Sequence, residues 1–337
     1  MSEISPPICT CSQPACQQGR PWAANISLVR RLRHSHPANA LRWALNFRGQ
    51  RRAIGRRYVF DVLSMVTPSV AVDTDGVRFY VSTSDREVSR ETFARGAYER
   101  ELFSRVTEAL RRVAPEACKL EGRGFLDIGG NIGSATCIAL HRYGAEQAWT
   151  FEPAPENLKL LRQNVLVNGF DRRVQVHPVA LSDHDGSVVF ELSSASWGDH
   201  RVRVEQPGND DRPALLDETG RDTFKVPARR LDSLIDDGSV DLGALGLAWI
   251  DVQGHEGHVF AGATKLLASN VPIVCEYWRY GLERSDGLER FNTLIAASRR
   301  RFIDLGAAGY TVRSTEQLGD LRGHYRGLAG TDLLLLS

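Results

Sequence analysis

Residues 124–133 read GFLDIGGNIG, and this order of residue types predicts a β-strand, a tight loop and the start of a helix. A short apolar run ends at Asp127, three glycines follow, and a segment with helical spacing begins after Gly133. Glycine accepts positive φ in such a turn and lets a ligand approach the bare backbone. The stretch therefore predicts a cofactor-binding loop at the carboxyl end of a strand.

The separation in sequence between this loop and a second acidic residue is also informative. The next apolar run, Gln147 to Phe151, leads into Glu152, which lies 19 residues after Gly133. An acidic side chain at the tip of the second strand can accept hydrogen bonds from both hydroxyl groups of a ribose. We therefore expect this part of the chain to hold a cofactor that contains a nucleoside.

The first residue of the loop discriminates between cofactors. In the nicotinamide-dinucleotide fingerprint the position of Asp127 is a glycine, and the pyrophosphate rests on the helix N-terminus. A carboxylate there would repel a pyrophosphate and suits a ligand with a cationic amino group. S-adenosylmethionine carries an ammonium, a sulfonium and a ribose, so we favour it over NAD. A glycine-rich turn that binds nothing is the remaining alternative.

Eight residues are predicted to bind this cofactor. Asp127 is expected to order the loop and meet the ammonium group, and Glu152 is expected to bind the ribose. Ser182 and Asp183 follow the third strand, where they are placed to meet the adenine edge. The remaining four shape the turn or follow Glu152 directly, and they are Gly129, Asn131, Gly133 and Pro153.

The composition is that of a globular protein, and the order of strand and helix patterns predicts an α/β fold. The chain has 337 residues, of which 42% are hydrophobic and 25% charged, which are ordinary values. Apolar runs alternate with helical patterns after Asp127, and such strands imply a doubly wound sheet with helices on both faces. Strands are predicted at 147–151, 174–177, 187–192, 245–252, 272–276 and 332–336 and near Phe302; helices are predicted at 155–167, 231–235, 256–268 and 287–300.

Three regions are expected along the chain. Residues 1–68 form an arginine-rich, partly disordered extension, 69–120 a small β element and a helix, and 121–337 the cofactor-binding domain. Ten arginines and no acidic residue lie between Ile4 and Phe60, whereas residues 61–337 carry 32 basic against 40 acidic side chains. The basic extension therefore contrasts with an acidic body.

The basic extension leaves several partners open. It could touch nucleic acid, an anionic membrane surface or an acidic partner, or it could be a solvated tail or a helix docked on the body. An RNA-binding or RNA-modifying protein is thus an alternative function, although no basic-aromatic platform is seen. No apolar run approaches the ~18 residues of a membrane span and no signal peptide is seen, so we expect a cytoplasmic protein.

No metal site is predicted from the residue spacings. Three cysteines within residues 9–16 could complete a zinc site with a downstream histidine, but their spacing matches no common zinc pattern. His255 and His258 lack the four-residue separation of a helical zinc pair. Asp251 and Glu276 leave a divalent ion open, because carboxylates bind hard cations.

Ser193 to Phe224 is the longest irregular stretch of the chain and is rich in Gly, Asp and Arg. A loop of this length in a compact domain is usually functional or disordered. Two interpretations stay open: a lid over the substrate, which we expect to shape the acceptor pocket, or a mobile insertion without function.

The motifs together resemble the FkbM-type S-adenosylmethionine-dependent methyltransferases. The similarity spans about Gly96 to Ser337. It implies a class I methyltransferase (Rossmann-like) fold with a seven-stranded mixed sheet whose last hairpin is antiparallel. It also implies O-methylation of a hydroxyl on a sugar, a polyketide or another secondary metabolite. The motifs that carry the resemblance are residues 127–133, 151–153, 179–183, 231–232 and 250–256 together with Asn157.

Three residues are the catalytic candidates. A hydroxyl acceptor must lose its proton, so a general base near the methyl donor would help. Asp251 lies at the carboxyl end of a central strand, His255 follows it closely, and Glu276 is expected to end the next strand. The family usually has Glu where this chain has Gln253, which leaves the identity of the base among these residues open. The acceptor is expected to be a small molecule or a glycan, and the sequence does not fix an oligomeric state.

Overall fold

The computed structural model describes most of the chain after the arginine-rich extension. The chain divides into two units, Met1–Arg52 and Ala53–Ser337, and the fold described below is that of the second unit. Most of the basic extension, with the three cysteines near its start, lies outside the described residues. Those residues are 51–96, 99–117, 120–193, 196–203 and 221–337.

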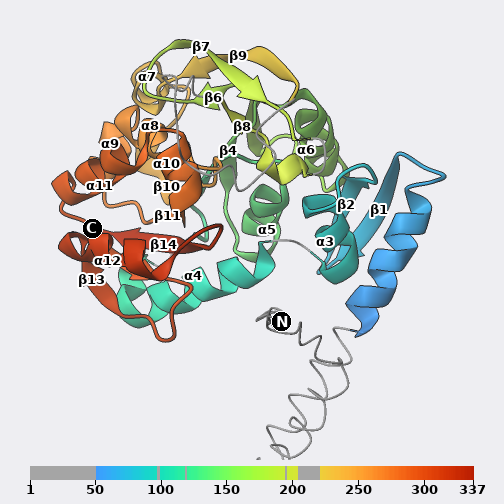
Figure 1. Ribbon diagram of the computed structural model, residues 1–337, viewed down its shortest axis with the longest axis horizontal. Helices are drawn as coiled ribbons and strands as arrows, with labels where there is room; N and C mark the ends of the chain where they lie inside the picture. Colours follow the sequence, from blue (N-terminus) through green and yellow to red (C-terminus); the bar gives the residue numbers. More distant parts are fainter. Residues whose placement is uncertain (1–50, 97–98, 118–119, 194–195, 204–220) are drawn as a thin grey trace, which may run out of the picture. The chain divides into compact units, whose positions relative to one another are not determined.

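The main sheet has eight strands in the order β13-β12-β14-β11-β10-β3-β4-β5, and it forms the middle layer of the unit (Figure 1). Strands β5, β4, β3, β10 and β11 run parallel, whereas β14 is antiparallel to both of its neighbours, β11 and β12. The strand bounds are β3 Gly124–Ile128, β4 Gln147–Phe151, β5 Val174–His177, β10 Leu245–Ile250, β11 Ile273–Trp278, β12 Arg301–Asp304, β13 Val312–Ser314 and β14 Gly330–Leu336.

This topology confirms the predicted class I doubly wound fold and its antiparallel last hairpin. The predicted number of seven strands is wrong, because Val312–Ser314 pairs with β12 and adds an eighth strand at the edge. Three residues with mixed polarity give too short a pattern for a strand to be predicted.

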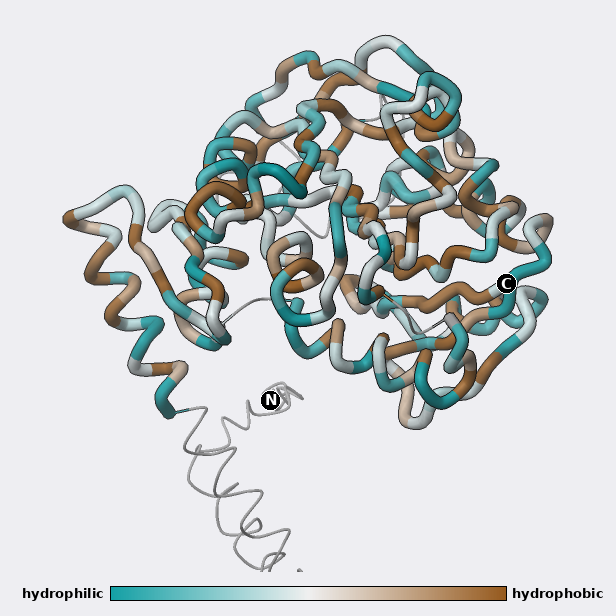
Figure 2. Tube along the Cα trace, turned by 180° about the vertical axis from the view of Figure 1, so that it is seen from behind, coloured by the Kyte–Doolittle hydropathy of each residue, from teal (hydrophilic) through white to brown (hydrophobic). Residues whose placement is uncertain are grey.

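Alternating strand residues enter two separate cores. Phe125 and Leu334 belong to one apolar cluster, and their neighbours Leu126 and Leu335 belong to the other. Because successive strand side chains point to opposite faces, the two clusters are the two sides of the sheet. The strands that lie near the C-terminus are brown over much of their length in Figure 2. Helices α4 (Arg100–Val113), α5 (Ser134–Arg142) and α6 (Pro155–Val167) cover the first side; α7 (Leu231–Asp236), α8 (Glu256–Ala261), α9 (Thr264–Ala268), α10 (Arg279–Arg284), α11 (Leu288–Ala297) and α12 (Leu318–His324) cover the second.

Two smaller sheets flank the main one. The small β element expected within residues 69–120 is an antiparallel hairpin of β1 (Ser69–Thr74) and β2 (Val77–Ser82), and α3 (Val88–Arg95) follows it. A four-stranded sheet has the order β6-β9-β7-β8, with bounds Ala180–Leu181, Thr223–Arg229, Gly186–Glu191 and Arg201–Val202. Among the described residues, no helix combines the length and apolar character that crossing a membrane requires. The cytoplasmic location stays a prediction.

The predicted helix over 256–268 is wrong in one respect, because it is two helices separated at Gly262. A Cβ on Gly262 would lie 2.0 Å from the backbone oxygen of Ser182, so the chain there packs against another backbone. Asp232 then starts the second helix by accepting hydrogen bonds from the backbone N–H groups of Thr264 and Lys265, both at 3.0 Å. Long-range packing therefore overrides the local helical pattern.

Asn164 on α6 links the hairpin to the glycine loop. The backbone N–H of Tyr80 donates to Asn164 Oδ1 at 2.6 Å, and Asn164 Nδ2 donates to the backbone oxygens of Tyr80 at 3.1 Å and of Ile132 at 2.9 Å. The asparagine is fully buried. Strand β2 and the loop after β3 therefore hold their positions through one amide group.

Replacing Asn164 by alanine should destabilise the protein by about 2–3 kcal/mol, because buried backbone groups of Tyr80 and Ile132 lose their partners. Urea unfolding followed by circular dichroism measures the change. Asn168→Ala is the matched control, since Asn168 makes similar bonds to Arg78 one turn later at an exposed place. An equal loss in both variants would contradict the role given to Asn164.

Candidate active site

A pocket opens at the carboxyl ends of the parallel strands. This is the edge at which open α/β sheets bind their ligands. Its walls come from the loops after β3, β4 and β10, from the four-stranded sheet and from the segment around Trp197. The lining residues include the predicted Gly129, Asn131, Glu152, Pro153, Asp251 and His255, and also Ile128, Phe151, Asn157, Val179, Leu181, Phe190, Trp197, Gly198, His200, Val202, Val252 and Gln253.

The glycine loop packs directly against the loop after β10. Gly129 has φ +91°, and a Cβ on it would lie 1.8 Å from the backbone oxygen of Asp251. The N–H groups of Gly129 and Gly130 both donate to the backbone oxygen of Phe151, at 3.0 and 2.9 Å. Three strand ends therefore meet at Gly129, where no larger residue fits without moving the backbone of Asp251.

Glu152 is held in place by backbone donors. Asn131 N donates to its Oε2 at 2.9 Å and Ala154 N donates to its Oε1 at 2.7 Å. The side chain is 4% exposed, and burial raises the pKa of Glu152 to about 7. Each carboxylate oxygen keeps a lone pair beyond the backbone bond, so the group can still accept from a ligand in the pocket.

Asp127 lies beneath the loop, outside the set of residues that line the pocket. Its carboxylate accepts a hydrogen bond from Thr136 Oγ1 at 2.5 Å. Burial raises the pKa of Asp127 to about 7, and burial likewise raises the pKa of Glu99 to about 7. Gly133 also lies outside the lining and begins α5 with φ +83°. Asp127 and Gly133 therefore support the loop from within.

His255 is buried beside Ser182. Its Nε2 lies 3.0 Å from Ser182 Oγ, and the side chain is 4% exposed. Burial lowers the pKa of His255 well below its ordinary value, so the imidazole is neutral near pH 7. Its Nδ1 is buried and has no hydrogen-bond partner among the described residues. One ring nitrogen is thus engaged, and the other has no partner among the described residues.

Asp183 anchors a polar network next to this histidine. Ser182 Oγ donates to Asp183 Oδ1 at 3.3 Å, and His184, His258 and Arg290 also bind the carboxylate. Although burial alone would raise it, these hydrogen bonds hold the pKa of Asp183 well below its ordinary value. Neither Ser182 nor Asp183 lines the pocket, so their predicted contact with the adenine stays a prediction.

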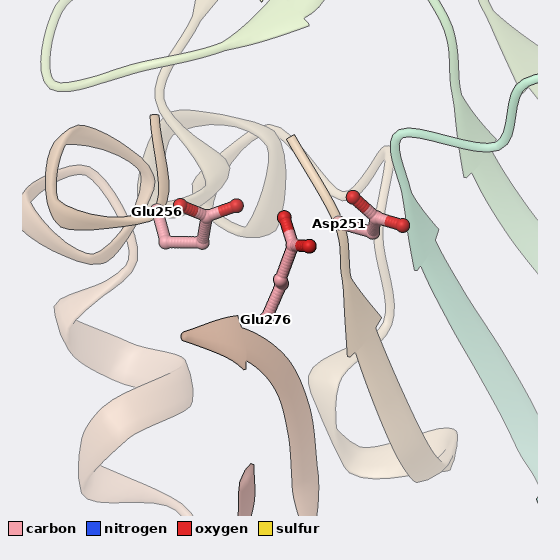
Figure 3. Close-up of side chains that lie close together, drawn as sticks. All are labelled: Asp251, Glu256 and Glu276. Carbon is pink, nitrogen blue, oxygen red and sulfur yellow. The ribbon is translucent and has the colours of Figure 1, made fainter. Parts of the chain in front are cut away.

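Three carboxylates converge behind the pocket: Asp251, Glu256 and Glu276 (Figure 3). One oxygen of each lies within 4.8 Å of the others. The Gln253 amide nitrogen donates to Asp251 Oδ1 at 2.7 Å and to Glu276 Oε2 at 3.4 Å. Glu276 does not end its strand as predicted, because β11 continues to Trp278.

Burial is the main reason why these three carboxyl groups resist ionisation. It raises the pKa of Glu256 to about 7 and raises the pKa values of Asp251 and Glu276, and the neighbouring carboxylates raise them further. Glu256 was not among the predicted site residues. The sequence marks Glu256 as the first residue of a predicted helix and as the last residue of the motif 250–256. Its place beside Glu276 depends on the fold.

The described part of the predicted lid forms one wall of the pocket. The backbone oxygen of Trp197 accepts from Asn131 Nδ2 at 3.2 Å and from Asn157 Nδ2 at 3.3 Å. Trp197 N donates to Asp85 Oδ1 at 3.2 Å. Burial lowers the pKa of His200 to about 4, so this lining residue is neutral. Residues 196–203 therefore close the site, while 194–195 and 204–220 lie outside the described residues.

The electrostatics of the site fit a cationic ligand. Burying several carboxylates in one region is costly unless positive charge accompanies them. Asp127, Glu152 and Asp251 surround the glycine loop, and burial raises the pKa of each. A ligand with an ammonium and a sulfonium would favour their ionised forms, whereas a pyrophosphate would add negative charge. The residues present therefore fit S-adenosylmethionine.

A sequence model described as "Methyltransferase FkbM domain" matches residues 127–301. The chain belongs to the FkbM methyltransferase family. The matched segment begins at Asp127 and contains the loops after β3, β4 and β10. The family uses S-adenosylmethionine, so the cofactor predicted from Asp127 and Glu152 is confirmed, as is the resemblance of the motifs.

Individual relatives match this chain at low sequence identity or over only part of its length. The "2-O-methyltransferase NoeI" of Sinorhizobium fredii (strain NBRC 101917 / NGR234) is 32% identical over 161 residues, which are 45% of this chain and 62% of the relative. The match thus spans less than two thirds of that protein. The FkbM methyltransferase of Methylobacillus flagellatus KT overlaps with a TM-score of 0.38 at 15% identity, covering 75% of this chain and 66% of that one. The O-methyltransferase of Bacillus cereus gives 0.37 at 18%, covering 69% and 81%. Neither overlap is close enough to transfer a residue assignment.

Gly129→Ala should abolish cofactor binding, because the added methyl group would overlap the backbone oxygen of Asp251. We expect a loss of stability of about 2 kcal/mol or more from overpacking and positive φ combined. Titration calorimetry with S-adenosylhomocysteine and thermal unfolding measure the two effects.

Gly169→Ala is the control for backbone strain alone, since Gly169 has φ +71° and open space around its Cβ position. It should lose about 1 kcal/mol of stability and keep its affinity for the ligand. If Gly129→Ala bound S-adenosylhomocysteine as tightly as Gly169→Ala does, the close approach would not matter for the site.

Proposed function

We propose that the protein methylates a hydroxyl group of a sugar-containing or other small-molecule acceptor. The observation that carries this proposal is a neutral histidine in the wall of the cofactor pocket, His255, whose Nδ1 has no hydrogen-bond partner among the described residues. The printed name of the NoeI relative, a 2-O-methyltransferase, supports oxygen as the acceptor atom. When bound, S-adenosylmethionine supplies a methyl group already activated by its sulfonium.

The chain's own contribution to the cofactor is to bind and orient it. Glu152 accepts from the ribose hydroxyls, since both carboxylate oxygens are fixed by backbone donors. Gly129 and Asn131 present bare backbone at the same wall, and Pro153 lines the pocket beside Glu152. Asp127 stabilises the ammonium group from beneath the loop. These roles follow the sequence prediction and are part of the proposal.

His255 receives the acceptor proton. Asp183 is ionised, so it accepts a hydrogen bond from the Ser182 hydroxyl group. Ser182 Oγ in turn accepts a hydrogen bond from Nε2–H of His255. This chain of bonds fixes the imidazole tautomer and leaves Nδ1 unprotonated. With the methyl donor bound, Nδ1 would accept the proton of the acceptor hydroxyl, while the donor would supply the methyl group. Ser182 and Asp183 act as positioning residues in this step.

The acceptor enters where the wall from 196–203 meets the loop after β10. Trp197, His200 and Val202 offer an aromatic ring, a neutral imidazole and an apolar side chain, a combination that suits the mixed surface of a sugar or polyketide. The alternative of RNA binding has no support, because the matched family segment 127–301 excludes the arginine-rich extension.

Affinity for S-adenosylhomocysteine should fall as the pH is lowered. With its pKa raised to about 7, Glu152 is ionised at pH 8 and mostly protonated at pH 6 in the ligand-free site. Because ribose hydroxyls donate to the ionised form, the dissociation constant should be about tenfold higher at pH 6 than at pH 8. Calorimetric titrations across this range measure it.

Glu152→Gln should weaken binding at pH 8 by about tenfold or more and flatten the pH profile. Glu156→Gln, which changes an exposed glutamate on α6 paired with Lys159, is the matched control and should leave both unchanged. A Glu152→Gln variant with the wild-type profile would contradict the assignment of Glu152 to the ribose.

Methyl transfer to oxygen is tested with isotope-labelled S-adenosylmethionine and a panel of hydroxylated glycans and polyketides, with NMR locating the methyl group. His255→Gln should lower kcat by about 10²-fold or more, which is typical for loss of a general base, and keep the affinity for S-adenosylhomocysteine. His324→Gln, at an exposed position on α12, should retain full activity.

Two results would contradict the proposal in different ways. A methyl group found on nitrogen or carbon of every turned-over acceptor would exclude O-methylation. Full activity of His255→Gln on a hydroxyl acceptor would instead leave O-methylation standing and remove the histidine as the base. In the second case, Ser182→Ala should also be without effect on kcat.

A further inference from the structure

We infer that Asp251, Glu256 and Glu276 form a binding site for one divalent metal cation of the magnesium or manganese class. Each residue offers a carboxylate oxygen, and these oxygens lie within 4.8 Å of one another. In Figure 3 the Glu276 carboxylate stands between the other two, and all three come from different elements. Hard cations of this class prefer oxygen ligands from carboxylates and amides.

The three ligands are positioned by the backbone of the central strands. Asp251 follows β10 directly and Glu276 lies in β11, which is parallel to β10 and pairs with it. Glu256 opens α8, and its Oε1 accepts from Val252 N at 3.1 Å and Gly254 N at 3.3 Å. The loop between β10 and α8 therefore turns back so that the third carboxylate reaches the first two.

The second oxygen of Glu256 is an independent observation that points to a ligand at this place. The residue is 0% exposed, and its Oε2 has no hydrogen-bond partner among the described residues. A buried carboxylate oxygen without a partner is costly, and Figure 3 shows this carboxylate directed toward Glu276. A cation between the two would satisfy that oxygen.

Gln253 completes the ligand set as a neutral member. Its side-chain nitrogen now bridges Asp251 at 2.7 Å and Glu276 at 3.4 Å, so the amide already reaches the space between the carboxylates. A half-turn of the amide places its oxygen in the same position, because the two atoms have nearly the same size. The backbone of Gln253 has φ +56°, which holds this side chain over the site.

The position of the site beside the cofactor pocket suggests a role for the cation in methyl transfer. This role rests on the proposed function. Asp251 and Gln253 also line the cofactor pocket, so a cation held between them could bind the acceptor oxygen. A bound cation lowers the pKa of a hydroxyl and favours its deprotonation. The acceptor proton would still leave to His255, as proposed above.

Manganese binding by the chelator-treated, full-length chain tests the site without requiring turnover. Titration calorimetry and electron paramagnetic resonance with Mn²⁺, followed by competition with Mg²⁺, should show one site per chain. Glu256→Gln keeps an oxygen for the Val252 and Gly254 donors, so the loop should stay folded, and it should weaken Mn²⁺ binding at least about tenfold. Circular dichroism checks the fold.

Asp332→Asn is the matched control. Asp332 is a partly buried acid opposite Glu276 on the neighbouring strand β14 and lies outside the three-carboxylate group, so its variant should bind Mn²⁺ within about threefold of wild type. Equal binding by wild type and Glu256→Gln, or no binding by either, would overturn the site. S-adenosylhomocysteine binding in the same metal-free sample separates the proposals. If this ligand binds and Mn²⁺ does not, only the metal site fails. The reverse result leaves the metal site and removes the proposed methyl transfer in this pocket.

Discussion

The site depends on the close approach of two backbones, that of Gly129 and that of Asp251. Strands β3 and β10 are parallel neighbours and end at the same level, so the loops that follow them compete for the same space. Only a residue without a side chain lets the first loop lie against the carbonyl of the second. From this contact follow the exposed backbone at the cofactor wall, the position of Glu152 beside it and the direction in which the loop toward His255 leaves the sheet.

Negative charge is the second theme of the site. Acidic side chains from at least four elements gather under one pocket, and burial opposes their ionisation. A ligand that brings positive charge stabilises the ionised forms of such a cluster. The methyl donor and a divalent cation would both interact with the negative charge of these carboxylates, which couples the affinities of the two ligands.

Local patterns predicted much of this structure and missed what depends on distant contacts. Strand β4, helix α6 and strand β5 have the predicted bounds, because turn residues and a proline mark their ends in the sequence. The break at Gly262 was missed since it comes from packing against Ser182. The same holds for the site: the residues in the glycine loop follow from spacing, whereas the unpartnered oxygen of Glu256 and the bond between Ser182 and His255 exist only once the elements have assembled.

The placement of β14 has a consequence for how the protein is made. This strand lies between β11 and β12, and Leu333, Leu334 and Leu335 are completely buried in it. During synthesis on the ribosome, β11 emerges before its partner β14, which begins more than 50 residues after β11 ends. Until then one edge of β11 is open to pairing with other chains. Nascent chains of this protein should therefore depend on chaperones until β14 has been inserted.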